Sequence, residues 1–168
     1  MSIAEHLIPE FDHEMVSTRA LLERLPEAKC AWKPHPKSWT LGDLAVHVAR
    51  IPSWCAVTLQ AAEFDLNPEG GSPFPKVAFT TTAALVNLFD DNVREARSSL
   101  LAVPDSGMME TWTLKNAGNT LFSMPRIAVY RSMVMNHLIH HRGQLTVYAR
   151  MNDVPLPAIY GPSADTPM

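Results

Sequence analysis

Residues 125–152, PRIAVYRSMVMNHLIHHRGQLTVYARMN, decide the fold of this chain. They predict one long amphipathic helix, because Pro125 suits a first helical turn and the inward-facing positions recur every three or four residues. These positions hold Ile127, Tyr130, Val134, His137, His141, Gln144 or Leu145, and Tyr148. Two of them are histidines spaced by four residues. Their rings therefore lie on one face, one turn apart, where they could hold one metal ion.

Three other segments show the same helical spacing of apolar residues. They cover residues 3–25, 40–67 and 82–102. Pro52 lies inside the second segment and predicts a kink, because proline removes a backbone hydrogen bond. Residues 68–75, rich in proline and glycine, form a connector between the second and third helices. Residues 112–122 predict a small hairpin or an ordered loop before the last helix.

The pattern predicts an all-α protein, a four-helix bundle with a long crossover connection between the second and third helices. At 168 residues, the chain is expected to form one domain over residues 1–168. Bundles of this kind build metal sites in the core from side chains on facing helices.

Composition excludes several classes of protein. The chain is 46% hydrophobic and 18% charged, which is typical of a globular protein, and its net charge of −3 offers no basic surface for nucleic acid. No apolar run reaches the roughly 18 residues that a membrane span needs. The N-terminal residues lack the pattern of a signal peptide, and two cysteines make no disulfide framework. We therefore expect a cytoplasmic protein with a small-molecule substrate, and no nucleic-acid or membrane partner.

A third histidine, His47, lies on the inward stripe of the second helix. That stripe reads Thr40, Leu44, His47, Ile51 and Trp54. Three imidazoles in one core are unfavourable unless their nitrogens find partners, since an unpaired buried polar group costs about 1–3 kcal/mol. One divalent metal ion would satisfy His47, His137 and His141 together. Three ligands leave a coordination position open, as in catalytic sites.

The spacing alone leaves two interpretations open, a metal site and core histidines that hold one another by hydrogen bonds. A zincin protease is disfavoured because Leu138 stands where the His-Glu-x-x-His motif needs glutamate. Gln144 and Asn136 are candidates for orienting the ligand rings. Gln144 is the better candidate because it continues the inward stripe, and a capping or packing role is the equal alternative for it. His140 points about 100° away from His141 and is expected on the surface.

The aromatic residues near the three histidines have two possible roles. Trp39 and Trp54 flank His47, with core packing as the first expectation and the lining of a substrate pocket as the second. Tyr130 and Tyr148 stand about two turns on either side of the histidine pair, so either hydroxyl could reach the open side. Arg142 is expected to form an ion pair or an interface contact.

The chain resembles the DinB/YfiT-like family of four-helix-bundle metalloenzymes. Three pieces carry the resemblance, in order along the sequence. They are SWTLGDLAVH at residues 38–47, HxxxHRGQ at residues 137–144, and NDVPLP with YGPSAD at residues 152–157 and 160–165.

The resemblance implies a metal site formed by His47, His137 and His141, with a divalent ion of zinc, nickel, iron or manganese. It also implies a homodimer and, for some relatives, transfer to a low-molecular-weight thiol such as mycothiol, bacillithiol or glutathione. We therefore expect a metal-dependent thiol S-transferase or hydrolase acting on a small molecule. A metal- or ligand-binding stress-response module without turnover is the alternative.

Overall fold

The computed structural model of the protein describes residues 2–71, 73 and 76–166, and it is mostly helical. Part of the predicted connector, at residues 72, 74 and 75, lies outside the described residues. The elements are α1 (Ile3–Leu22), η1 (Glu27–Lys29), α2 (Leu41–Arg50), α3 (Ser53–Gln60), β1 (Glu63–Asp65), α4 (Thr82–Ala102), α5 (Asp105–Met109), β2 (Thr111–Asn116), β3 (Asn119–Pro125), α6 (Arg126–Val129), η2 (Tyr130–Asn136) and α7 (His137–Arg150).

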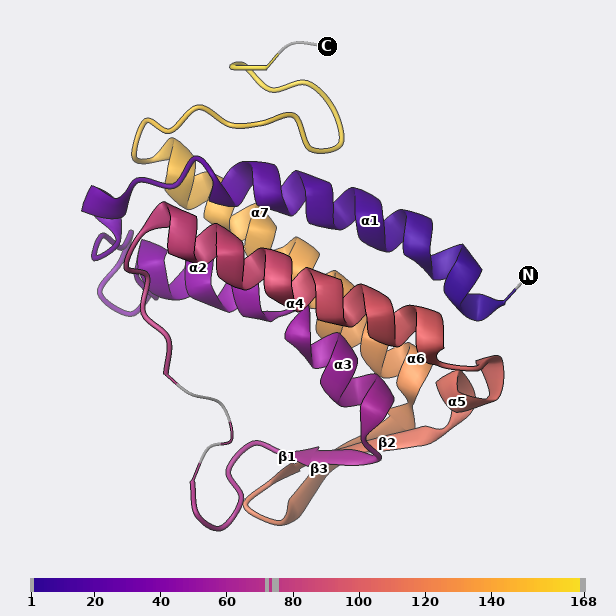
Figure 1. Ribbon diagram of the computed structural model, residues 1–168. Coiled ribbons are helices and arrows are strands. Elements are labelled where there is room, and N and C mark those ends of the chain that lie inside the picture. The colour runs from indigo at the N-terminus through magenta and orange to yellow at the C-terminus, as the bar shows by residue number, and fades with distance from the viewer. Residues whose placement is uncertain (1, 72, 74–75, 167–168) are drawn as a thin grey trace.

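The long helices lie side by side, and α2 and α4 run in the same direction (Figure 1). Because α2 and α4 are parallel, the chain between them, which includes α3 and β1, must return along the bundle before α4 begins. This return is the crossover that the sequence predicts. Helix α2 contacts both α4 and α7, while α1 packs on α4 and α7. The face of α2 that carries His47 can therefore meet the histidines of α7.

Two of the predicted helices match the structure closely. Helix α4 has the predicted bounds, and the Thr81 side chain caps it by accepting a hydrogen bond from the backbone N–H of Ala84 (3.1 Å). Helix α1 begins as predicted at Ile3 but ends at Leu22, three residues early. Residues 23–25 continue as a turn that still buries Leu25.

The second predicted helix is wrong in its continuity and its end. Instead of one kinked helix over residues 40–67, the chain forms α2 and α3 with a turn between them at Ile51 and Pro52. Here the backbone N–H of Trp54 donates to the Ile51 carbonyl, three residues back. Proline removes one helical donor and its ring crowds the preceding turn, so the helix breaks rather than bends.

The all-α expectation is also corrected, because the structure contains a small three-stranded sheet in the order β1-β2-β3. Strands β2 and β3 form the predicted hairpin, with Trp112 opposite Met124 and Asn116 opposite Asn119. Strand β1 pairs in parallel with β2 and takes residues that the sequence assigned to the second helix. The sheet packs against α3 and α6 and encloses a second small core around Trp112, Leu114 and Val129.

The last helix runs without a break from α6 through η2 to α7, but η2 is a π-helix. The sequence predicts the overall segment and not this change in hydrogen bonding. π-Helical turns are rare and are frequently found at functional sites. Here η2 ends directly before His137.

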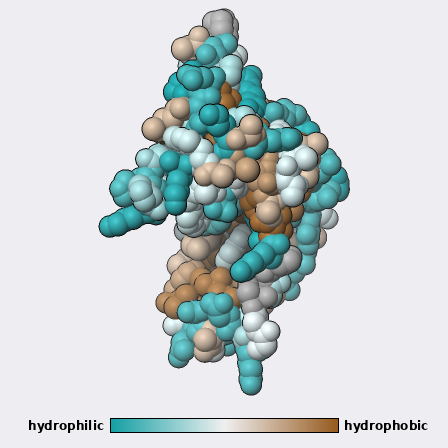
Figure 2. Space-filling model, turned by 90° about the vertical axis from the view of Figure 1, so that its left-hand side faces the viewer, coloured by the Kyte–Doolittle hydropathy of each residue, from teal (hydrophilic) through white to brown (hydrophobic). Residues whose placement is uncertain are grey.

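The main core lies between the long helices and holds most of the predicted inward-facing residues. They include Phe11, Met15, Leu44, Phe89, Leu100, Tyr130 and Leu145. Figure 2 shows one side of the surface as largely hydrophilic, with hydrophobic residues in a few separate patches. Among the described residues, no helix combines the length and the apolar character needed to cross a membrane.

Candidate metal centre

His47 is positioned by the well-defined start of α2. The Thr40 hydroxyl accepts a hydrogen bond from the backbone N–H of Asp43 (3.0 Å) and caps the helix. Gly42 lies so close to the preceding loop that a Cβ there would stand 3.0 Å from the Cys30 carbonyl oxygen. The cap and this close contact fix the rotation of α2, which turns His47 toward α7.

His137 and His141 lie on α7 next to its most buried face. That face consists of Leu138, Arg142, Leu145 and Ala149. Because the two histidines are one turn apart, both rings project toward α2. The ring centroids of His47 and His141 are 4.6 Å apart, and those of His47 and His137 are 4.9 Å apart.

The three histidines each offer one ring nitrogen to a common point. These nitrogens all lie within 4.8 Å of one another. The Nε2 atoms of His47 and His137 are separated by 3.1 Å. Two nitrogens bound to one tetrahedral zinc ion at about 2.0–2.1 Å stand about 3.3 Å apart, so the observed separation suits a shared metal ion.

The outer ring nitrogens establish which atoms face the common point. Nδ1 of His137 lies 3.2 Å from the Met133 carbonyl oxygen, and Nδ1 of His141 lies 2.8 Å from Oε1 of Gln144. Both oxygens only accept, so each Nδ1 carries the proton and each Nε2 presents a lone pair. A proton on His47 can satisfy only one of these two lone pairs. Mutual hydrogen bonding therefore leaves one acceptor unmatched, whereas a divalent cation fits all three residues.

Burial keeps the three rings neutral, which is the form that binds metal. Burial, together with the nearby His137, His141 and Arg50, lowers the pKa of His47 to about 4. Burial likewise lowers the pKa of His137 and of His141, against opposing effects of the Met133 carbonyl and the Gln144 side chain. The cluster is thus poised to take up a cation rather than protons near neutral pH.

These shifts predict how the stability of the metal-free protein depends on pH. The unfolded chain binds protons at histidine near the ordinary pKa of 6.5, whereas folded His47 does so only near 4. The stability that the neutral His47 contributes is therefore fully present above pH 6.5 and is lost as the pH falls toward 4. Urea unfolding between pH 4 and 8 should show this loss, with a shallower slope for His47→Gln. Equal slopes in the two proteins would show that His47 is not held neutral by the fold.

Gln144 is exposed, and Leu145 takes the inward position instead. The Gln144 side chain still contacts Nδ1 of His141 at 2.8 Å, which fits an orienting role. Partners of this kind typically contribute 10–100-fold to metal affinity, so Gln144→Ala should weaken Zn²⁺ binding by about that factor. Gln144→Glu keeps an acceptor for the Nδ1 proton and should bind nearly as tightly as wild type. Competition titration against a chromophoric chelator measures both. Equal weakening by the two substitutions would contradict an orienting role.

Trp39 is not the core residue that was expected first. It is 50% exposed and covers the cluster, stacking on His141 at a centroid distance of 5.7 Å and meeting the edge of His47 at 5.0 Å. A cavity of about 310 Å³ lies on its His47 side, with Trp54 in the wall. A second cavity of about 240 Å³ lies on its His141 side, next to Gln144 and Tyr148. For Trp39, pocket lining is therefore the correct expectation. Trp54 meets both expectations, because it packs against both hydrophobic cores and lines the larger cavity.

Several other residues considered in the sequence analysis are not part of the three-histidine cluster. Tyr130 is completely buried in the main core, and burial raises the pKa of its hydroxyl. Asn136 is exposed. His140 is exposed, as predicted, although its ring stands 4.9 Å from that of His141. Only Tyr148, through the smaller cavity, stays beside the site.

One backbone group and two side chains of the site were not predicted from the sequence. The backbone group is the Met133 carbonyl. The backbone N–H of His137 donates to the Val134 carbonyl and not to that of Met133, the α-helical acceptor four residues back. The Met133 oxygen contacts Nδ1 of the His137 ring instead, at 3.2 Å. This contact follows from backbone geometry, and no pattern of side chains in the sequence indicates it. The two side chains are those of Asp43 and Arg50, which share a face of α2 with His47 and line the larger cavity.

A mostly helical bundle with three histidines converging from two facing helices defines a class of candidate metal-binding proteins. The family model of the DinB superfamily matches residues 10–145. The chain therefore belongs to the DinB superfamily, as its sequence motifs indicated.

Individual relatives agree with this assignment. The chain is 25% identical to the uncharacterized protein YrdA of Bacillus subtilis (strain 168), over 96% of this chain and 90% of that protein. The crystal structure of a DinB-like protein from Bacillus cereus ATCC 10987 superimposes with a TM-score of 0.70 at 22% identity, covering 95% of this chain and 98% of that one. The DinB-like protein YjoA from Bacillus subtilis gives 0.69 at 20% identity, covering 92% and 97%. At these identities the two crystal structures show the shared fold alone.

Proposed function

We propose that the protein is a metal-dependent enzyme in which His47, His137 and His141 hold one divalent ion of zinc, nickel, iron or manganese. The observation that carries the proposal is that one ring nitrogen from each of His47, His137 and His141 lies within 4.8 Å of the others, while oxygen atoms contact Nδ1 of His137 and of His141. When bound, such an ion would supply Lewis-acid activation of a water or a thiol.

The residues of the chain would define the surroundings of the reaction. The Met133 carbonyl and Gln144 hold two rings in one orientation, while Trp39 shields the cluster from solvent. The cavities on either side of Trp39 give a small molecule access to the cluster. Access to the open side favours an enzyme over a purely structural site, because structural metal sites are closed by protein ligands.

The reaction we propose is transfer to a low-molecular-weight thiol or hydrolysis of a small molecule. Thermal unfolding of untagged, metal-loaded protein with a panel of thiols, including glutathione, bacillithiol and mycothiol, separates these reactions. A stabilising shift that disappears on chelation supports the transferase. Turnover of small esters or amides without any thiol shift supports the hydrolase. Bound metal with neither result supports the stress-response binding module and contradicts the enzyme.

A homodimer and a cytoplasmic location are also part of the proposal. The dimer rests on the family resemblance, and exposed Val16, Met109, Val147 and Met151 are the apolar residues available for contact. Light scattering should give twice the chain mass of 18.6 kDa, and a monomeric mass would contradict the dimer.

A further inference from the structure

The larger cavity beside Trp39 has walls that differ in chemistry. Its lining consists of Trp39, Asp43, Val46, His47, Arg50 and Trp54. The two indoles and Val46 are apolar and suit a hydrocarbon or aromatic group. His47 belongs both to this lining and to the histidine cluster, so a molecule in the cavity reaches the cluster directly.

Charged residues stand on either side of His47 along α2. Asp43 is one turn before it and Arg50 one turn after it, and residues so spaced share a helix face. Arg50 is three residues from His47, which corresponds to about 4.5 Å along the helix axis. A ligand that reaches from His47 to Arg50 is therefore a small molecule whose two polar ends are a few bonds apart.

The two charges are not equivalent as ligand-binding groups. The Asp43 carboxylate accepts a hydrogen bond from the Thr40 hydroxyl (2.6 Å) and sits in the first turn of α2, where the helix dipole stabilises negative charge. It is thus already compensated by the fold. Arg50 lies in the last turn and is half-buried in the cavity wall. A guanidinium has five N–H donors in a planar fork, so it can bind a carboxylate through two of them while keeping other contacts.

We propose that this cavity is a subsite for small organic anions, with the acidic group on Arg50 and an apolar portion between Trp39 and Trp54. The opposite end of the ligand then lies at His47 and the cluster. As a statement about the enzyme's substrate, the inference rests on the proposed function. The anion subsite itself is formed by the protein alone. Arg50 is accordingly a residue that determines specificity for acidic substrates.

Calorimetric titration with 3-phenylpropionate and its neutral counterpart 3-phenylpropanamide tests the subsite directly. The two probes have nearly the same shape and differ in charge. The wild-type protein should bind the acid about tenfold more tightly than the amide, since a charge-assisted bidentate pair is roughly twice as strong as a neutral one. Arg50→Gln should reduce acid binding about tenfold, to the level of the amide, and leave amide binding unchanged. Arg50→Lys should retain part of the preference, because it keeps the charge without the fork.

The matched control is Arg94→Gln, which removes the same charge from α4. The Arg94 side chain is 75% exposed and pairs with Asp91. This variant should bind the acid like wild type. Equal binding of acid and amide by wild type, no acid binding at millimolar concentration, or equal losses in Arg50→Gln and Arg94→Gln would each overturn the proposal. If Arg50→Gln fails to fold, the comparison of acid and amide binding by wild type, and the binding of both probes by Arg50→Lys, still test the proposal.

The titration is run on both the metal-free and the Zn²⁺-loaded protein, so that the two proposals can fail separately. An acid preference in protein that binds no metal supports the subsite and contradicts the metal centre. Stoichiometric metal without an acid preference contradicts the subsite and leaves the metal centre intact.

Discussion

Replacing His137 by alanine is expected to lower the affinity for Zn²⁺ by more than about 100-fold, beyond the 10–100-fold typical of losing a residue that merely orients a ligand. His137 provides the Nε2 atom that lies 3.1 Å from Nε2 of His47, so its loss removes a direct ligand and leaves two. The remaining imidazoles of His47 and His141 lie on different helices and then lack a third histidine to bind the metal with them. Competition with a chromophoric chelator measures the loss.

His140→Ala is the matched control, because it removes a neighbouring histidine of the same helix that is exposed and outside the cluster. It should retain nearly all of the wild-type affinity. Similar losses in the two variants would mean that histidine content in general, and not this cluster, binds the metal.

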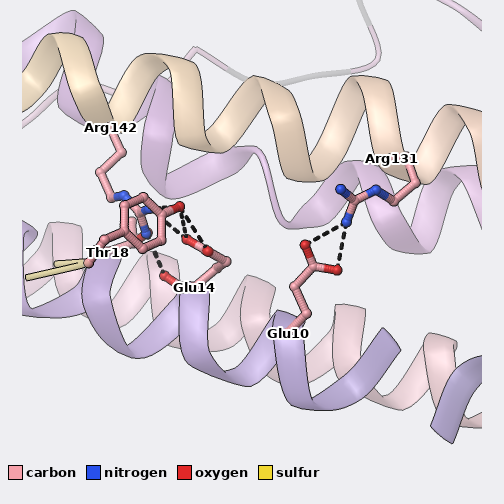
Figure 3. Close-up of polar contacts among 6 residues, drawn as sticks. Glu10, Glu14, Thr18, Arg131 and Arg142 are labelled. Carbon is pink, nitrogen blue, oxygen red and sulfur yellow. Dashed lines mark hydrogen bonds and ion pairs between the residues drawn. The ribbon is translucent and has the colours of Figure 1, made fainter. Parts of the chain in front are cut away.

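Arg142→Met is expected to destabilise the protein by about 3–5 kcal/mol, the effect of leaving one member of a buried ion pair alone. The side chains of Arg142 and Glu14 are only 2% and 6% exposed. Arg142 also donates to the Glu14 carbonyl (3.1 Å), the Thr18 hydroxyl (3.2 Å) and the Tyr160 hydroxyl (2.7 Å). Figure 3 shows how this arginine joins the last helix to α1. Urea unfolding at neutral pH measures the change.

The same two segments provide the control in the pair between Arg131 and Glu10, also drawn in Figure 3. Its side chains are 42% and 41% exposed, so Arg131→Met should change stability by about 0–1 kcal/mol. Adding Glu14→Gln to Arg142→Met should restore part of the loss, because no unpaired charge is then buried. Equal destabilisation by the two single arginine variants would contradict the importance of burial.

The elements that could be predicted carry local signals. Helix α4 has a regular stripe, Thr81 as its cap and Pro104 shortly after its end, and its bounds were predicted correctly. Strand β1 has only three residues, and it pairs with β2 about fifty residues later. Such a strand is stabilised by its distant partner, which short-range patterns do not contain. The proline at position 52 was read correctly as a disruption, but whether a helix bends or breaks depends on the packing around it.

The residues of the candidate site also differ in whether a local pattern in the sequence predicts their position. His47, His137, His141 and Gln144 were predicted because helical spacing fixes which residues share a face. Trp39 precedes a helix, where no periodicity indicates its direction, and it covers the site instead of entering the core. The role of the Met133 carbonyl depends on a π-helical turn, which changes backbone hydrogen bonds and leaves no pattern of side chains.

The metal content of untagged protein, measured by inductively coupled plasma mass spectrometry after reconstitution and desalting, tests the central claim most directly. The account predicts one equivalent of divalent metal per chain in wild type and almost none in His137→Ala. Wild-type protein that retains no stoichiometric zinc, nickel, iron or manganese would contradict it and leave the three histidines as a hydrogen-bonded part of the core.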